Sequence, residues 1–172
     1  MNIAGQRIFL RAIEPDDNAM LLEMVNDPDT EYMLGGWSFP VSTTQQDHWT
    51  QELENASTIL RCAIDDHCKA VGVVMLNPID LKNGTAEVHI RLASDARGKG
   101  YGADAVDAIV CYAFDELRLQ CVYSHVSEHN IASKRLFLSC GFKEEGLLIN
   151  RLYKRGRLIS VYSLSKQRSA ID

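Results

Sequence analysis

The sequence predicts an α/β protein of the α+β type, with helices on both faces of a mixed, mostly antiparallel central sheet. Three observations support this class. Apolar residues alternate with polar ones in several short segments, they recur every three to four residues in others, and the two kinds of segment follow one another along the chain. Hydrophobic residues make up 46% of the 172 residues, so we expect residues 1–172 to form a single domain with a substantial core.

The N-terminal part of the chain is expected to contain a short strand and two helices. Pro15 suits the first turn of a helix, and the acidic residues beside it favour the positive end of the helix dipole. The run Asn26-Asp27-Pro28 ends this helix, and Ser42 with Gln45 forms a capping-box pattern at the start of the next. The expected elements are a strand at 7–12, a helix at 14–25, a loop at 31–40 and a helix at 42–55.

The remaining chain is expected to form a meander of strands followed by alternating helices and strands. Asn83 and Gly84 are a strong hairpin signal. Apolar residues keep the helical period over 101–117, and Gly141 is the residue type preferred just past a helix end. The expected elements are strands at 58–64, 70–76 and 85–92, a helix at 101–117, a strand at 121–126, a helix at 130–140, and strands at 142–149 and 158–164.

Charge and composition argue against several classes of partner. The formal net charge of −5 disfavours nucleic acid. Residues 1–10 lack a signal-peptide pattern and no segment has the roughly 18 apolar residues that span a bilayer, so we expect a cytoplasmic protein without a membrane partner. Cys62, His67 and Cys68 have no second ligand pair at zinc-like spacing, so no metal is expected. One basic cluster is expected to be a solvated hairpin tip, namely Arg151, Lys154, Arg155 and Arg157.

The clearest chemical signal is the glycine-rich loop at 97–102, which joins a strand to the N-terminus of a helix. Successive backbone N–H groups there can point into one concavity, and the helix dipole adds positive potential. Glycines let the backbone approach an anion closely, so a phosphate or pyrophosphate is the natural ligand. Arg97 and Lys99 can add charge, whereas a turn that only reverses the chain is the alternative interpretation.

Two other phosphate-binding motifs fit this loop less well. The Walker pattern is absent, because no Gly-Lys-Ser or Gly-Lys-Thr occurs. Gly98, Gly100 and Ala103 satisfy the dinucleotide fingerprint by letter, but the preceding strand belongs to an antiparallel hairpin rather than to an opening βαβ unit. A nucleotide-dependent oxidoreductase is therefore the weaker hypothesis.

The loop resembles the central motif of the GNAT superfamily of acyl-CoA-dependent N-acyltransferases. That motif is Arg or Gln, two residues, Gly, one residue, and Gly or Ala, and here it is filled by Arg97, Gly100 and Gly102. A second family block is filled by Asn130, Ser133, Phe137, Gly141 and Phe142. The resemblance covers nearly the whole chain and is closest to the branch of ribosomal-protein N-terminal and diamine (spermidine-type) acetyltransferases.

The resemblance implies acetyl-CoA as the co-substrate, no metal, and a place for each part of the cofactor. The pyrophosphate is expected on the loop residues Arg97, Gly98, Lys99, Gly100, Tyr101 and Gly102. The pantetheine arm is expected along Ile90, Arg91 and Leu92, beside a slot that opens where the strand at 121–126 splays away. Contacts from the far side are expected from Asn130, Ser133 and Phe137. The acceptor is a small-molecule amine or a peptide N-terminus, and a homodimer is compatible with the family.

Three ionisable side chains on the strand at 85–92 are the candidates for catalysis. An alkylamine has a pKa near ~10.4 and arrives mostly protonated, so acetyl transfer needs a base. Side chains alternate along a strand, which places Glu87, His89 and Arg91 on one face. Glu87 matches the position where family members hold a water-linked general base, and His89 is the next candidate. A salt bridge between Glu87 and Arg91 on an exposed face is the alternative.

The sequence departs from the family at Phe137, which occupies the position of the usual acid, a tyrosine. Phenylalanine has no proton to give, so the leaving thiolate takes its proton from solvent or from another group, for which Tyr123 and Tyr153 are candidates. Phe137 also favours the alternative function, which is a non-catalytic acyl-CoA-binding sensor or partner module.

The acceptor site is expected over residues 31–49 and 150–157, as the resemblance implies. Three aromatic residues either wall a pocket there or belong to the core, namely Trp37, Phe39 and Trp49. A polyamine requires carboxylates, for which the candidates are Glu31, Asp47 and Glu52. Arg91 favours instead an acceptor with some negative charge. A peptide N-terminus, a polyamine, an amino sugar and an amino acid all stay open.

Overall fold

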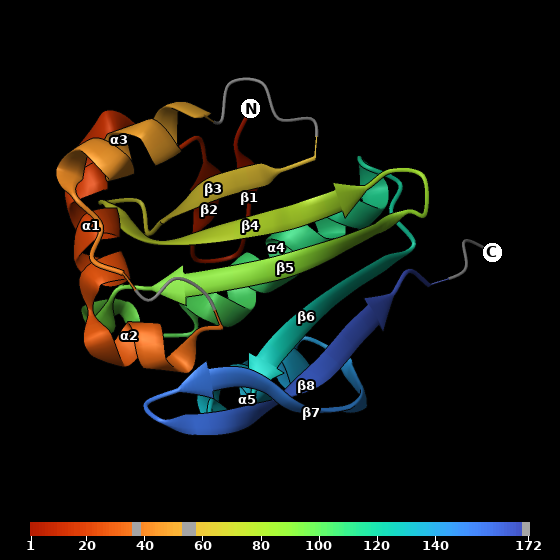
Figure 1. Ribbon diagram of the computed structural model, residues 1–172. Coiled ribbons are helices and arrows are strands. Elements are labelled where there is room, and N and C mark those ends of the chain that lie inside the picture. The colour runs from red at the N-terminus through yellow and green to blue at the C-terminus, as the bar shows by residue number, and fades with distance from the viewer. Residues whose placement is uncertain (36–38, 53–57, 170–172) are drawn as a thin grey trace.

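The sheet of the protein is mixed, as the sequence predicts. The computed structural model describes residues 1–35, 39–52 and 58–169, and within these ranges eight strands form one sheet in the order β1-β2-β3-β4-β5-β6-β8-β7 (Figure 1). In this sheet β5 and β6 run parallel, whereas the other neighbouring pairs are antiparallel. The strands are β1 (Ile3–Ala4), β2 (Phe9–Arg11), β3 (Leu60–Asp65), β4 (Ala70–Asp80), β5 (Thr85–Leu92), β6 (Cys121–Ser127), β7 (Lys143–Lys154) and β8 (Arg157–Gln167).

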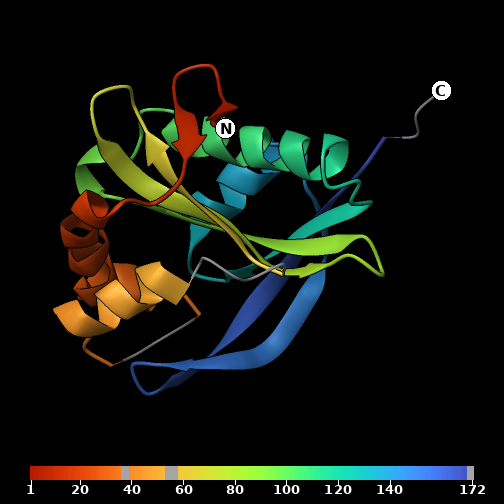
Figure 2. The ribbon, with the colours of Figure 1, turned by 90° about the horizontal axis from the view of Figure 1, so that it is seen from above.

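Helices cover both faces of this sheet. In Figure 2, α4 and α5 lie on one face, and α1 and α3 lie on the other. None of the helices in the described ranges combines the length and the apolar character needed to cross a membrane. The helices are α1 (Asn18–Asn26), α2 (Pro28–Met33), α3 (Thr43–Gln51), α4 (Tyr101–Asp115) and α5 (Ile131–Ser139).

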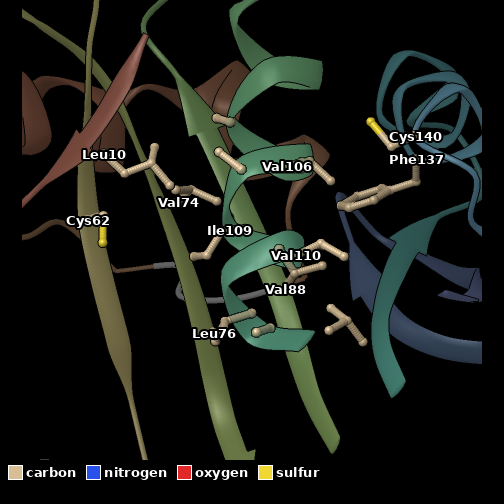
Figure 3. Packing of buried hydrophobic residues seen from close by; sticks show 14 of the residues in the cluster. Leu10, Cys62, Val74, Leu76, Val88, Val106, Ile109, Val110, Phe137 and Cys140 are labelled. Atoms are coloured by element: carbon tan, nitrogen blue, oxygen red, sulfur yellow. The ribbon is translucent and has the colours of Figure 1, made fainter. Parts of the chain in front are cut away.

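The larger core lies between α4 and the inner strands. Val106, Ile109 and Val110 of α4 pack with Val74 of β4 and Val88 of β5, and each of the five is at most 1% exposed (Figure 3). Burial of a side chain of this size contributes about 1.5–3 kcal/mol. This apolar face is the one that the helical period of 101–117 predicts, and it holds the N-terminus of α4 in place beside β5.

A smaller core lies on the opposite face of the sheet, beneath α1 and α3. Its fully buried members are Ile13, Leu21, Met24, Ala63 and Val73. Trp49 of α3 packs against this cluster, so its indole belongs to the core and does not wall an acceptor pocket. The capping box predicted at the start of α3 is present, because the Ser42 hydroxyl accepts from the Gln45 amide and the Gln45 side chain accepts from the Ser42 amide. The expected end of this helix at 53–55 lies outside the described residues.

The expectation of a loop beginning at residue 31 is wrong, because α2 extends to Met33. The run at 26–28 does end α1, but it also begins the next helix. Asp27 accepts hydrogen bonds from the amides of Asp29 and Thr30 at 3.3 and 3.0 Å, and Pro28 occupies the first helical turn. The same residues therefore end α1 and begin α2. Trp37 lies outside the described residues.

The expectation of a fully solvated basic tip at 151–157 is also wrong. Lys154 is 6% exposed, and its ammonium contacts the carboxylate of Glu31 and donates to the Glu31 carbonyl at 3.2 Å. The Arg155 guanidinium lies 4.2 Å from the ring centre of Tyr32 and donates to the carbonyl of Pro28 at 3.2 Å. The tip of the β7–β8 hairpin thus docks on α2, which local sequence does not reveal.

Replacing Asp104 by alanine is expected to lower the free energy of unfolding by about 1–3 kcal/mol. Its carboxylate accepts hydrogen bonds from the amides of Gln6, Arg7 and Ile8 at 2.8, 2.6 and 3.1 Å, and so ties the N-terminal hairpin to α4. Urea denaturation measures the change. Asp107→Ala is the matched control on the same helix, since Asp107 is exposed and makes one 3.7 Å ion pair. Equal losses in the two variants would contradict the assignment.

Candidate active site

The central feature of the site is a slot between β5 and β6. The two strands pair only from Thr85 to Glu87 on β5 and from Cys121 to Tyr123 on β6. Beyond that point β5 continues along β4 to Leu92, while β6 continues along β8 (Figure 1). The splayed strand that the resemblance implies is therefore present, and the backbone edge of β5 after Glu87 faces the slot.

Two cavities meet in this slot. The slot cavity, of about 430 Å³, is lined by Glu87, His89 and Arg91 of β5 and by the facing residues 124–127 of β6. The loop cavity, of about 660 Å³, extends from Ile90–Leu92 to the glycine-rich loop and α5. The residues that line both cavities are Met33, Leu34, Ile90, Arg91, Asn130 and Ser133. The two cavities therefore adjoin along a shared wall.

The glycine-rich loop presents free amides to the loop cavity. Gly98 and Gly100 adopt φ values of +75° and +85°, a region that favours glycine. Within the described ranges, the amides from Gly98 to Gly102 donate to no carbonyl or side chain, and the N-cap Gly100 offers no side-chain cap to α4. These unpaired donors sit at the positive end of the helix dipole, so an anion can bind them.

Gly102 has a different reason to be glycine. A Cβ at this position would lie 2.6 Å from Cδ1 of Leu136, which belongs to α5. The absence of a side chain therefore lets α4 and α5 pack closely, and this packing fixes one wall of the loop cavity. This position of the family motif therefore serves the packing of the two helices.

The charged residues around the loop cavity differ in part from the expected ones. Arg97 lines it, but its guanidinium also donates to Thr30 Oγ1 at 2.9 Å and to the carbonyl of Leu92 at 3.2 Å, which holds α2 on the end of β5. Arg135 of α5 lines it as well, and no sequence motif identified it. Lys99 and Tyr101, which were expected to bind the cofactor, are not among the lining residues of this cavity.

Glu87 lies in the slot cavity, where its partner is a residue that the sequence did not identify. The Glu87 carboxylate accepts a 2.9 Å hydrogen bond from Nδ1 of His125 on β6. The side chain of Glu87 is 17% exposed and that of His125 is 37% exposed, so both reach the cavity. The salt bridge between Glu87 and Arg91, which was the alternative interpretation, is not formed among the described residues, and the Glu87 carboxylate lies instead 3.9 Å from Nε2 of His89. The sequence signal that could have identified His125 is its imidazole, an ionisable group in a strand whose other residues are mostly apolar or small.

His89 lies on the same face of β5 as Glu87, as alternation predicts, but its ring is committed elsewhere. The register between β4 and β5 shifts so that Asn77 and Pro78 lie together opposite Glu87. The carbonyl of Asn77 accepts a hydrogen bond from His89 Nε2 at 2.9 Å. Because a carbonyl only accepts, Nε2 carries the proton and is not available as a base.

The far wall of the slot is formed by α5. Asn130 caps this helix, since its side chain accepts from the amide of Ser133 at 3.1 Å and donates to the carbonyl of Met33 at 3.2 Å. Phe137 lines the slot cavity and is 2% exposed, with its ring packed at 5.0 Å against Phe142. The wall at Phe137 is therefore apolar, and it carries no proton donor.

The two tyrosines considered as substitutes for the missing acid do not line either cavity. Tyr153 is 70% exposed on β7. Tyr123 packs its edge on His125 with ring centres 5.6 Å apart, and burial raises the pKa of its phenol, with the charge of Glu87 adding to the shift. No group of three or more His, Cys, Asp or Glu side chains in the described part of the chain is arranged to hold a metal ion.

The carboxylates proposed for a polyamine do not line the slot cavity. Glu31 contacts Lys154, and Asp47 accepts from the Asn18 amide at 2.7 Å. Glu52 lies near Arg61 and lines neither cavity. Phe39 is 69% exposed. The slot cavity is lined instead by residues of β5 and β6, by residues 33–35, by Asn130, Ser133 and Phe137, and by Leu152 of β7 and Val161 of β8, besides Met75 and Asn77 of β4.

Comparison with known proteins agrees with this geometry. Residues 7–143 match the family model described as an acetyltransferase (GNAT) domain. The chain is 29% identical to an uncharacterized N-acetyltransferase, p20, of Bacillus licheniformis over 93% of this chain and 92% of that protein. It is 33% identical to a spermidine N(1)-acetyltransferase of Vibrio cholerae over 56% and 57% of the two chains. The fold is similar to the structure of a Vibrio cholerae spermidine N-acetyltransferase in complex with CoA and spermine, with a TM-score of 0.87, 24% identity, and 94% and 95% of the chains covered.

Proposed function

We propose that this chain, which belongs to the GNAT acetyltransferase family, transfers the acetyl group of acetyl-CoA to a primary amine by direct attack in a ternary complex. One observation carries the proposal: the loop cavity and the slot cavity are joined at Ile90 and Arg91. The loop cavity has the unpaired amides for a diphosphate, and the slot cavity has the ionisable groups for the chemistry. A protein that only sensed acetyl-CoA would need the first cavity alone.

The cofactor is proposed to lie across the junction of the two cavities. The amides from Gly98 to Gly102 hold the diphosphate, and Arg97 and Arg135 add positive charge. The pantetheine arm pairs with the edge of β5 at Ile90–Leu92, which β6 leaves open, in the manner of an added strand. Asn130 and Ser133 contact it from α5. This arrangement brings the thioester to the mouth of the slot cavity, where the amide near Leu92 can donate to the developing oxyanion.

The proton of the acceptor amine is proposed to leave through His125 and Glu87. The carboxylate of Glu87 holds the Nδ1–H of His125, so the proton of a neutral ring sits on Nδ1 and the lone pair sits on Nε2. That lone pair takes the proton from the incoming ammonium, and Glu87 orients the ring and stabilises its positive charge. Glu87 is thus a positioning residue in this arrangement. His89 is a weaker candidate for the base, because its Nε2 donates to the carbonyl of Asn77.

The bond changes follow from this arrangement. The freed amine lone pair attacks the thioester carbonyl carbon, a C–N bond forms, and the C–S bond breaks with its electron pair on sulfur. The attacking nitrogen, positively charged once the C–N bond has formed, loses a second proton to solvent and becomes the neutral amide. The thiolate is a good leaving group and takes its proton from solvent, because Phe137 has none to give. The apolar ring of Phe137 instead closes the slot against the core.

Release of coenzyme A in the presence of an amine panel is the experiment that tests the function. We expect acetyl-CoA-dependent, saturable acetylation of at least one primary amine, with the product mass raised by one acetyl group. Tight binding of acetyl-CoA without turnover on any amine would instead support a sensor. A thermal-shift comparison of acetyl-CoA with NAD separates both from an oxidoreductase.

A further inference from the structure

Arg91 is a charged side chain in the slot for which the described residues supply no partner. It lies at the junction of the slot cavity and the loop cavity, on the same face of β5 as Glu87 and His89. Across residues 1–35, 39–52 and 58–169 its guanidinium makes no ion pair or hydrogen bond. Burial lowers its pKa, yet an arginine stays protonated in proteins. A half-buried guanidinium without a counter-charge is costly, so an anion is expected to approach it.

Among the residues that the structure describes, none supplies an anion for Arg91. Glu87 is the one carboxylate among the described residues that line the slot cavity, and it is bound to His125 at 2.9 Å. Two acidic side chains outside this cavity are engaged with other residues, since Glu31 contacts Lys154 and Glu128 accepts from the amide of Ser160 at 3.0 Å. The slot cavity therefore holds one carboxylate, already paired, and one unpaired cation.

This charge balance is the opposite of what a polyamine needs. A polyamine carries several positive charges and gains from a cavity with several unpaired carboxylates. Here it would place further cations beside Arg91 in a partly desolvated space. The cofactor does not resolve the imbalance either, because the pantetheine arm that is proposed beside Ile90–Leu92 is uncharged and the phosphates lie at the loop.

We propose that Arg91 binds an oxyanion of the acceptor, so that the acceptor is a small primary amine that also carries a carboxylate or a phosphate group. The inference rests on the proposed function and names the substrate class of that same site. A guanidinium binds either oxyanion through two parallel hydrogen bonds. Positions 87 and 91 are separated by about 13 Å of extended strand. Because both side chains reach into the cavity, the amine and the anion are separated by several bonds in the preferred acceptor.

Matched pairs of amines test the inference on the full-length protein. Propylamine is compared with 4-aminobutyrate, ethanolamine with phosphoethanolamine, and spermidine serves as the polycation. We expect kcat/KM to be at least about 10-fold higher for the anionic member of a pair, because that member alone can form a charge-assisted hydrogen bond with Arg91. The carboxylate and phosphate pairs show which oxyanion is favoured, and glycine, 4-aminobutyrate and 6-aminohexanoate give the preferred length.

Variants of Arg91 separate recognition from folding. Arg91→Gln is expected to lower kcat/KM for the anionic amine by about 10-fold or more beyond any loss for the neutral member of the pair, so that the ratio between the two members falls. Arg91→Lys is expected to restore part of the loss, and Arg91→Glu to reverse the order in favour of spermidine. Arg118→Gln is the matched control, because Arg118 is exposed and lines neither cavity.

The outcomes distinguish this inference from the function itself. Turnover that is greatest on spermidine or on uncharged amines overturns the inference and leaves the acetyltransferase function standing. Equal losses for both members of a pair in Arg91→Gln overturn it as well, because they indicate a structural or cofactor role. Absence of turnover on every amine overturns both.

Discussion

Gly100→Glu is expected to abolish measurable binding of acetyl-CoA, with at least a 100-fold loss of affinity in a calorimetric titration. Gly100 has a φ of +85°, so any other residue adds strain of about 1–2 kcal/mol. The new Cβ would lie 3.3 Å from Nη1 of Arg7, and the carboxylate would occupy the positive end of α4. There it takes the place of the diphosphate and repels it, so charge and volume act in the same direction.

Gly156→Glu is the matched control for this change. Gly156 has a φ of +79° at the tip of the β7–β8 hairpin, and a Cβ there meets no atom within 4 Å. Gly156→Glu therefore introduces the same side chain with a similar backbone strain, but at a position outside the loop cavity. The affinity of the Gly156→Glu variant for acetyl-CoA is expected to equal that of the unmodified protein. If Gly100→Glu also kept its affinity, the loop would not be the diphosphate site.

His125→Asn is expected to lower turnover by about 100-fold or more, the usual contribution of a positioned base. The asparagine amide can still donate to Glu87 where Nδ1–H does now at 2.9 Å, so the structural contact is kept while Nε2 is lost. Steady-state kinetics should show the loss in kcat with little change in the KM for acetyl-CoA. His67→Asn is the matched control, because His67 is exposed, lines neither cavity and has a φ of +73° that asparagine tolerates.

Glu87→Gln tests the alternative assignment, in which Glu87 rather than His125 is the base. The glutamine oxygen can still accept from Nδ1–H but brings no charge, so we expect a smaller loss of turnover than in His125→Asn, partly recovered at high pH. If Glu87→Gln removed turnover while His125→Asn kept it, Glu87 itself would be the base, acting through water. Either result leaves the site in the slot and decides which atom takes the proton.

The sequence by itself determined the features that depend on residues close together in the chain. The period of 101–117 predicted the buried face of α4, alternation placed Glu87, His89 and Arg91 on one face of β5, and the glycines of 97–102 predicted a loop with free amides. These features follow from steric and hydrogen-bonding rules that act over a few residues. The splay of β5 and β6 was expected from the resemblance to the family.

Only the tertiary structure decided which distant residues meet. His125 reaches Glu87 because β5 and β6 pair in one particular register, and the two residues are 38 positions apart in the chain. The docking of Lys154 on α2 and the isolation of Arg91 likewise depend on how whole elements pack. A local pattern fixes the face on which a side chain lies, but register and packing fix its partner, and the partner decides whether a carboxylate accepts a proton, orients a histidine or neutralises an arginine.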